Sequence, residues 1–479
     1  MSSLKDKTVK GMIWSAVDRF SAQGIQFVFS ILIARLLMPE DYGVVAMLGI
    51  FLAVSQTFID SGFGTALIRK INRTEEDFST VFYFNIVAAV ALYLVLFLLA
   101  PIIAKFYDTP LLEPVTKVIS LSLVISSLSG IHNSKLSIAI DFKSKAKASI
   151  LSALFTGFVG LWMAYAGYGV WALVAQSLSL RITWTVMMWI FVPWRPQLVF
   201  SWKSFKELFS FGSKLLASGL LDTIYNNLYT LVIGKVYTPT TLGLYSRASS
   251  LAQFPSFNIT SVIQTVTFPV LSTIQNEDVR LRDAYKRLLK VSAFIVFPFM
   301  VGLAAVADPF IKTVLTDKWI GVIPLMQILC FSLMWNPIHT INLNILQVKG
   351  RSDYFLRLEI IKKVQGVFFL IITVPMGIIA MCWGNIINSL LNLLWNTYYT
   401  KKLVSYGFLE QFVDILPILI HSLIMGSIVS IVVYFVPIIW VKLIAGIIVG
   451  MVYYIVGAYM MRFPEINELL TILKLKNQN

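Results

Sequence analysis

Apolar stretches that are each long enough to cross a bilayer recur along the whole chain of 479 residues, and they constrain its fold more than any other feature. A helix needs ~20 apolar residues to cross a hydrocarbon layer of ~30 Å. Because lipid offers no hydrogen bonds to the backbone, only helices and closed barrels can span it. Uninterrupted apolar runs such as 86–99 and 443–460 lack the alternation of barrel strands. The sequence therefore predicts an all-α polytopic membrane protein.

The charge composition agrees with a membrane protein. Hydrophobic residues make up 57% of the chain and charged residues 13%, about half the charged share that is usual in soluble domains. The formal net charge of +15 would indicate nucleic-acid binding in a soluble protein, but no such motif accompanies it here, so we expect no nucleic-acid partner. The three histidines and two cysteines are not grouped at metal-ligand spacing, and we expect neither a metal site nor a cofactor.

The hydropathy pattern predicts about fourteen transmembrane helices. The first, seventh and eighth carry the most polar residues within their spans. The predicted spans are 11–37, 43–67, 78–104, 113–133, 147–166, 169–192, 208–234, 242–270, 289–308, 322–346, 355–380, 382–400, 412–436 and 439–461.

Basic residues are unevenly distributed over the loops between these spans. One side of the membrane holds most of the 39 lysines and arginines, in clusters such as 69–73, 143–147 and 280–290. The opposite side holds few: Lys105, Lys117, Lys235, Lys312, Lys318 and Lys442. Since basic loops are retained in the cytoplasm, we expect both termini there. The outer loops are too short to form a soluble catalytic domain.

A short internal repeat suggests two related halves. Residues 33–43 (IARLLMPEDYG) and 233–243 (IGKVYTPTTLG) share an isoleucine, a basic residue, a proline and a glycine at matching positions. Each stretch joins a polar span to the next one, although a generic Pro/Gly helix connection is the alternative explanation. Parallel repeats in transporters enclose a substrate site at their interface. We therefore predict two parallel six-helix lobes, 1–205 and 206–405, followed by two additional transmembrane helices and a cytoplasmic tail, 406–479.

Ionisable side chains lie within the spans of the two matching helix pairs. Arg19 is in the first span, Lys214 and Asp222 are in the seventh, Arg247 is in the eighth and Asp60 is in the second. Ionisable groups in a membrane usually face a cavity or one another. We predict one central cavity whose cationic walls bind substrate through Arg19, Lys214 and Arg247.

Two questions about these residues stay open at the level of sequence. The basic side chains could instead form structural pairs between the lobes, for example Asp18 with Arg247 or Asp222 with Arg19. The carboxylates Asp60 and Asp222 are candidates for ion coupling, because a carboxylate in a membrane cavity can bind a proton or a cation.

A second group of polar residues forms an amide ladder in the twelfth span. Its members are Asn385, Asn388, Asn392 and Asn396. Asn336 and His339 share a face of the tenth span. Amides in membrane helices more often join helices than bind ligands, and we expect the same here.

Several segments resemble a known family. They are 34–43 (ARLLMPEDYG), 60–68 (DSGFGTALI), 82–85 (FYFN), 243–248 (GLYSRA) and 268–272 (FPVLS). These segments resemble the polysaccharide-flippase (Wzx-type) branch of the MOP superfamily, and most of all its colanic-acid exporter-like members.

The resemblance implies a MOP flippase-like fold, a V-shaped pair of six-helix bundles. It implies that the protein is not an enzyme but moves undecaprenyl-pyrophosphate-linked oligosaccharide from the cytoplasmic to the periplasmic leaflet of the lipid membrane. The cationic cavity of the family falls here on Arg19, Lys214 and Arg247. Gln26, Tyr225 and Asn258 are candidates for sugar contacts, and a polysaccharide polymerase is a candidate partner.

Three alternative functions remain at this stage. A peptidoglycan-precursor (lipid II) flippase of the same superfamily would also have fourteen spans and a cationic cavity, whereas a multidrug exporter should have an acidic one. A membrane glycosyltransferase or polymerase could use Glu40 and Asp41 of the first outer loop as a catalytic pair. The matching loop of the second half has Thr240 and Thr241 instead, which argues against the enzyme.

Overall fold

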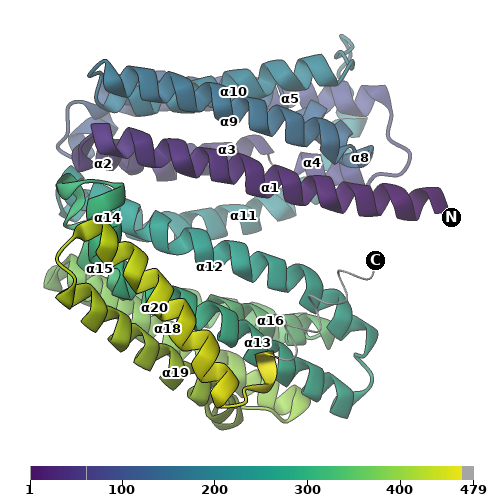
Figure 1. Ribbon diagram of the computed structural model, residues 1–479. Coiled ribbons are helices and arrows are strands. Elements are labelled where there is room, and N and C mark those ends of the chain that lie inside the picture. Colours follow the sequence, from purple (N-terminus) through teal and green to yellow (C-terminus); the bar gives the residue numbers. More distant parts are fainter. Residues whose placement is uncertain (1, 61, 467–479) are drawn as a thin grey trace. The chain divides into compact units, whose positions relative to one another are not determined.

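The computed structural model in Figure 1 describes residues 2–60 and 62–466. Within these ranges it describes every side chain except those of residues 2–13, 15–19 and 266. Every regular element in this described part is helical. The helices are α1 (Ser2–Leu36), α2 (Pro39–Met47), α3 (Gly49–Asp60), α4 (Phe63–Arg69), α5 (Glu75–Phe106), α6 (Leu112–Ile119), α7 (Leu121–Ser127), α8 (Gly130–Ile138), α9 (Phe142–Tyr165), α10 (Val170–Phe191), α11 (Trp202–Val236), α12 (Pro239–Thr273), α13 (Asp278–Ala305), α14 (Ala307–Val314), α15 (Val322–Leu333), α16 (Asn336–Val348), α17 (Ser352–Thr373), α18 (Ile378–Val404), α19 (Phe408–Phe435) and α20 (Ile439–Met460), with short 3₁₀ turns η1 (Asp317–Trp319) and η2 (Val374–Met376).

Ten helical segments of the described part are long and apolar enough to cross a membrane. They correspond to ten of the predicted spans, some of them built from consecutive short helices such as α6, α7 and α8. The other four predicted spans fall on the more polar helices α1, α11, α12 and α17. The all-α membrane fold is thus confirmed, while the count of fourteen spans stays a prediction.

One predicted boundary was wrong. The eleventh span was expected to continue to residue 380, but α17 ends at Thr373. Pro375 lacks the backbone N–H that a helix interior requires, and Gly377 adopts a φ of 99° that other residues avoid. The chain therefore turns at η2, and α18 begins at Ile378.

The start of α5 illustrates how a polar sequence signal fixes a helix end. Thr74 is its N-cap, and the Thr74 hydroxyl accepts a hydrogen bond from the Asp77 N–H at 3.3 Å. The Thr74 N–H in turn donates to the Asp77 carboxylate at 2.9 Å. This reciprocal capping box satisfies two of the N–H groups that a helix start leaves unpaired.

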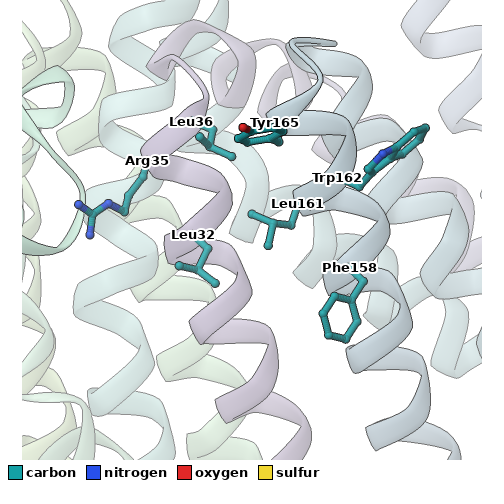
Figure 2. A pocket seen from close by; sticks show the side chains of 7 residues that line it. All are labelled: Leu32, Arg35, Leu36, Phe158, Leu161, Trp162 and Tyr165. Atoms are coloured by element: carbon teal, nitrogen blue, oxygen red, sulfur yellow. The ribbon is translucent and has the colours of Figure 1, made fainter.

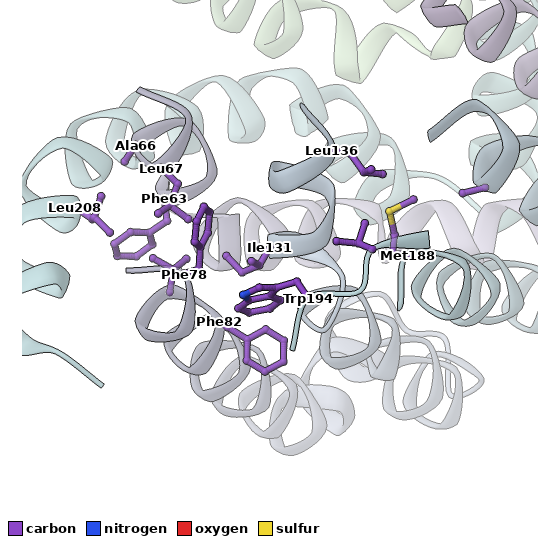
Figure 3. Close-up of a cluster of buried hydrophobic side chains, with 13 residues drawn as sticks. Phe63, Ala66, Leu67, Phe78, Phe82, Ile131, Leu136, Met188, Trp194 and Leu208 are labelled. Carbon is purple, nitrogen blue, oxygen red and sulfur yellow. The ribbon is translucent and has the colours of Figure 1, made fainter. Parts of the chain in front are cut away.

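By backbone contacts the chain divides into two compact units, 1–243 and 244–479. A buried aromatic core in the first unit includes Phe63, Phe82 and Trp194, and Leu208 of α11 belongs to it (Figure 3). Helix α11 accordingly packs against α3, α4 and α5. The six-helix lobes 1–205 and 206–405 remain a prediction about the repeat.

Small residues allow close helix packing in the first unit. Helices α1, α9 and α10 lie side by side, with α9 between the other two (Figure 1). A Cβ added at Gly157 of α9 would lie 2.2 Å from the Phe29 ring of α1, so only glycine fits there. Glycine contacts of this kind are typical of helix pairs in membranes.

The second unit is held together by amides, as the sequence predicted. Gln365 of α17 donates to the Asn388 side chain of α18 at 2.7 Å. Asn396 and Ser389 of α18 bond to the two ring nitrogens of His339 of α16, at 3.3 and 3.0 Å. The prediction that the ladder joins helices is therefore confirmed for these residues.

The last two helices complete the second unit. Helix α19 packs along α13, and α20 packs against α19 and α14. Both helices are strongly apolar, which suits contact with lipid on their outer faces.

Candidate functional site

The three predicted cavity cations lie in different parts of the described chain. Lys214 is exposed on α11, in the first unit, whereas Arg247 of α12 is only 6% exposed and belongs to the second unit. The side chain of Arg19 lies outside the described residues. The common cavity predicted for these residues therefore stays a prediction.

The three candidate sugar contacts lie on helix surfaces that are at least partly accessible. Gln26 of α1 is exposed, and Tyr225 of α11 and Asn258 of α12 are half-buried. The Asn258 amide donates to the Phe254 carbonyl of its own helix at 2.7 Å. One of the two amide donors of Asn258 is therefore already used, and its other donor and its carbonyl oxygen could both contact a ligand.

The two candidate coupling carboxylates differ in their surroundings. Asp222 is exposed on α11. Asp60, at the end of α3, accepts a hydrogen bond from the Gln56 amide at 3.0 Å, and Gln56 in turn accepts one from Ser126 of α7 at 3.1 Å. The charge of Arg181 on α10 also acts on Asp60. Asp60 thus belongs to a polar chain that joins three helices.

Asp60 also lines a polar cavity of about 340 Å³ within the first unit. Residues of α3, α4, α5 and α8 form its walls, including Asn85 and Asn133. These two asparagines are not among the site residues predicted from the sequence. Their position within otherwise apolar spans was the available signal, because uncompensated amides are costly in a membrane.

The acidic pair that an enzyme could have used, Glu40 and Asp41, lies in the first turn of α2. The Asp41 carboxylate accepts a hydrogen bond from the Met38 N–H at 2.9 Å and so caps the start of α2. Glu40 lies in the same first turn, where acidic side chains are favoured by the helix dipole. Asp41 therefore has a capping role at the start of α2.

A cavity of about 570 Å³ between α1 and α9 is apolar. Figure 2 shows Leu32 and Leu161 facing it, while Arg35 points away from the aromatic side chains of α9. Trp162 and Tyr165 are 66% and 83% exposed. Exposed Trp and Tyr near a helix end are typical of the membrane interface, so this surface suits lipid rather than a polar substrate.

A further apolar groove lies in the second unit. It has a volume of about 520 Å³ and lies between α13, α14, α19 and α20. Phe299, Val429 and Met451 are among the side chains that line it. Such a groove can hold a hydrocarbon chain but offers little to a sugar.

Comparison with known proteins gives a consistent family assignment. A model of the family described as "Polysaccharide biosynthesis protein" matches residues 32–324. The teichuronic acid biosynthesis protein TuaB of Bacillus subtilis is 25% identical, over 74% of this chain and 74% of that protein. The lipopolysaccharide biosynthesis protein WzxC of Escherichia coli is 25% identical, over 86% of this chain and 84% of that protein.

The fold also matches a solved structure. The lipid II flippase MurJ in an inward closed conformation superposes with a TM-score of 0.76, covering 94% of this chain and 99% of that one at 17% identity. At this identity the likeness concerns the fold alone. The predicted resemblance to Wzx-type polysaccharide proteins is confirmed by the family match and by WzxC, and the chain belongs to the polysaccharide biosynthesis protein family.

Proposed function

We propose that this protein is a flippase that moves an undecaprenyl-pyrophosphate-linked oligosaccharide from the cytoplasmic to the periplasmic leaflet, for export of an exopolysaccharide, O-antigen or capsule. The observation that carries the proposal is the family match over residues 32–324, which extends across both compact units. TuaB is named for teichuronic acid biosynthesis and WzxC for lipopolysaccharide biosynthesis. The membrane-spanning helices supply the setting in which a lipid-linked precursor would be handled.

The charge of the pyrophosphate is the main physical obstacle to this movement. Opposite unit charges 4 Å apart attract by ~1 kcal/mol in water and by ~4 kcal/mol at an effective dielectric constant of ~20. Fixed cations in a wet cavity would therefore lower the barrier substantially. Arg19, Lys214 and Arg247 are the residues proposed for this role, and the arginines can grip a phosphate with two parallel hydrogen bonds.

The two ends of the substrate need different surroundings. The sugars require a polar path, for which Gln26, Tyr225 and Asn258 are candidates. The prenyl tail can stay in the bilayer, and the apolar groove between α13, α19 and α20 offers a surface for part of it. Rocking of two lobes would then expose the headgroup to each side in turn.

The proposal includes a location and an energy source. We propose that the protein lies in the cell inner membrane with both termini in the cytoplasm, because loops rich in lysine and arginine are retained on the cytoplasmic side. Asp60 and Asp222 are the candidates for coupling to protons or sodium ions. A polysaccharide polymerase would receive the translocated unit.

The decisive experiment uses purified protein in proteoliposomes that contain the host's undecaprenyl-pyrophosphate-linked oligosaccharide in one leaflet. We expect the protein to raise the rate at which the glycan becomes accessible to an impermeant periodate or lectin probe on the other side. Lipid II in parallel liposomes tests the alternative substrate. Unchanged leaflet distribution of the host glycan, or a newly formed glycosidic bond, would refute the flippase.

A further inference from the structure

We infer that the polar cavity of the first unit is a saccharide subsite that binds one sugar ring of the transported glycan. This inference rests on the proposed function, and it assigns a part of the substrate to residues outside the predicted cationic cavity. Binding at this subsite uses hydrogen bonds only, and no covalent bond is formed or broken.

The cavity is formed where four helical segments meet. Helix α3 contributes Asp60, α4 contributes Thr65, α5 contributes Asn85, and α8 contributes Asn133 and Ser134. Helix α8 contacts both α4 and α5, and α3 contacts α5. Polar side chains from distant parts of the sequence therefore converge on one space.

Two buried amide oxygens in these walls lack a hydrogen-bond partner within the described residues. Asn85 is 7% exposed, and its Oδ1 atom receives no hydrogen bond from residues 2–60 or 62–466. The Oδ1 atom of Asn133 likewise receives no hydrogen bond from the described residues. Buried polar groups in native proteins are nearly always paired, so an unmet acceptor beside a cavity calls for a donor from a ligand or solvent.

The hydroxyl groups of the wall also present acceptors rather than donors. Ser134 donates its proton to the Gly130 carbonyl at 3.1 Å, and Ser137 donates to the Asn133 carbonyl at 3.0 Å. Each of these two hydroxyl oxygens keeps lone pairs that can accept a hydrogen bond. Together with the Asp60 carboxylate and the two amide oxygens, they give the cavity several acceptors for hydroxyl or N–H donors.

Charge and size distinguish a sugar from a cation. The Asp60 carboxylate already accepts from Gln56 and already experiences the positive charge of Arg181, which would repel a metal cation bound in the cavity, so the coupling role proposed for Asp60 is limited to a proton. The cavity volume of about 340 Å³ is roughly ten times the ~30 Å³ that one water occupies in the liquid. It lies at the lower end of small-molecule sites, which run from ~300 to 1,000 Å³. A neutral ring with several hydroxyl groups fits both conditions.

Glycines keep this space open. A Cβ at Gly130 would stand 3.7 Å from the Asn85 amide nitrogen, and one at Gly64 would stand 3.4 Å from the Ser134 hydroxyl. Both are ordinary contact distances, so the packing tolerates a side chain at these positions. Any such side chain would occupy the room that a sugar needs.

The test exchanges the unpaired asparagines for leucines of similar size. Asn85→Leu and Asn133→Leu remove an unmet acceptor, and the melting temperature should therefore stay the same or rise. In the proteoliposome assay with the host glycan-lipid we expect each variant to translocate about tenfold more slowly, as the loss of one or two hydrogen bonds to the sugar implies. Gly130→Leu should have the same effect by filling the cavity.

Asn344→Leu is the matched control. Asn344 of α16 is a buried asparagine whose amide nitrogen also lacks a partner within the described residues; it belongs to the second unit and does not line this cavity. It should translocate at the wild-type rate. A defect as large as that of Asn85→Leu would overturn the assignment, because the effect would then be general to buried asparagines.

The remaining outcomes separate this inference from the proposed function. If wild type translocates the glycan-lipid and stable Asn85→Leu and Asn133→Leu do so equally well, the subsite is refuted and the flippase stands. If wild type translocates nothing, the proposed function itself fails. Stabilisation of the wild type, but not of Asp60→Asn, by sodium chloride over choline chloride without any sugar would assign the cavity to a cation instead.

Discussion

Gly43 and Gly243, which occupy matching positions of the internal repeat, meet in the structure: a Cβ on Gly243 would lie 3.1 Å from the Gly43 backbone nitrogen. The contact is reciprocal. The same Cβ would lie 1.8 Å from the Pro39 carbonyl oxygen, and a Cβ on Gly43 would lie 1.8 Å from that of Pro239. The first turns of α2 and α12 therefore cross with each glycine against the proline of the other motif. The repeated Pro-x-x-x-Gly spacing thus has a packing function.

Alanine at either glycine should disrupt this crossing. The obstructing atoms belong to backbone carbonyls, which cannot rotate away as a side chain can. We expect Gly43→Ala and Gly243→Ala each to cost at least the ~3 kcal/mol that marks the upper end of ordinary overpacking. The measurement is the melting temperature in detergent, together with protein abundance in the membrane.

Gly24→Ala provides the control for these substitutions. Nothing lies within 4 Å of a Cβ at this position of α1, and alanine favours a helix over glycine by roughly 0.5–1 kcal/mol. Its stability should be equal to that of wild type or higher. Normal stability of Gly43→Ala would mean that the two turns do not cross this closely.

A buried hydrogen-bond network makes a second prediction, for Gln411 of α19. Its amide nitrogen is within 3.0–3.2 Å of Tyr285, Asn342 and Thr400, which lie on α13, α16 and α18. Gln411→Leu would leave those groups without part of their pairing, at ~1–3 kcal/mol for each group left unsatisfied. We expect a lower melting temperature, whereas Gln347→Leu on the exposed surface of α16 should have little effect. Equal stability of the two variants would contradict the network.

The sequence was sufficient for the class of fold because apolar runs determine membrane helices by themselves. Where local backbone chemistry intervenes, hydropathy alone misled: Pro375 and Gly377 end α17 inside a run that remains apolar. The polar cavity was missed for a different reason. Asn85 and Asn133 lie 48 positions apart, and only the packing of α5 against α8 brings them to one space. Helical periodicity assigns a residue to a face but cannot tell which other face it meets.

Lys70 carries a prediction about pH. Its ammonium group lies 3.1 Å from the buried Asp77 carboxylate and 3.0 Å from Glu207 of α11. Desolvation opposes the charged form, but these hydrogen bonds and charges outweigh it and raise the pKa of Lys70 above its ordinary value. The interactions that raise this pKa stabilise the fold fully at pH values below the unfolded-state pKa of about 10.4. Their contribution is lost as the pH rises through the higher pKa of the folded state.

This direction of the pH dependence can be checked by comparing the melting temperatures of wild type and Lys70→Met from pH 7 to 11. The variant should be less stable at pH 7, and the difference should shrink above about pH 10. Lys117→Met, which removes an exposed pair with Glu113 on α6, should differ little from wild type at neutral pH. A difference for Lys70→Met that grows with pH would contradict the pairing.

Topology can be tested with reporter fusions. Fusions after residues 72, 143, 204, 283, 352 and 402 should report cytoplasm, and fusions near 40, 109, 237 and 316 should report periplasm, because the basic loops of the first group are retained inside. An inverted result at one of the middle sites would break the fourteen-span arrangement and the parallel orientation of the two halves.

Arg247 gives the sharpest test of the proposed mechanism. It is only 6% exposed, and an arginine stays charged when partly desolvated and can bind phosphate through two hydrogen bonds. If it attracts the pyrophosphate, Arg247→Ala should lower glycan export at least about tenfold, equivalent to 1.4 kcal/mol, at normal membrane abundance. Arg247→Lys should be milder, because lysine keeps the charge and loses only the paired hydrogen bonds.

If Arg247 forms only a structural ion pair, the defect should be in stability, and neutralising Asp18 as well should partly restore it. Export at the wild-type level by both Arg19→Ala and Arg247→Ala would remove the two arginines from the mechanism.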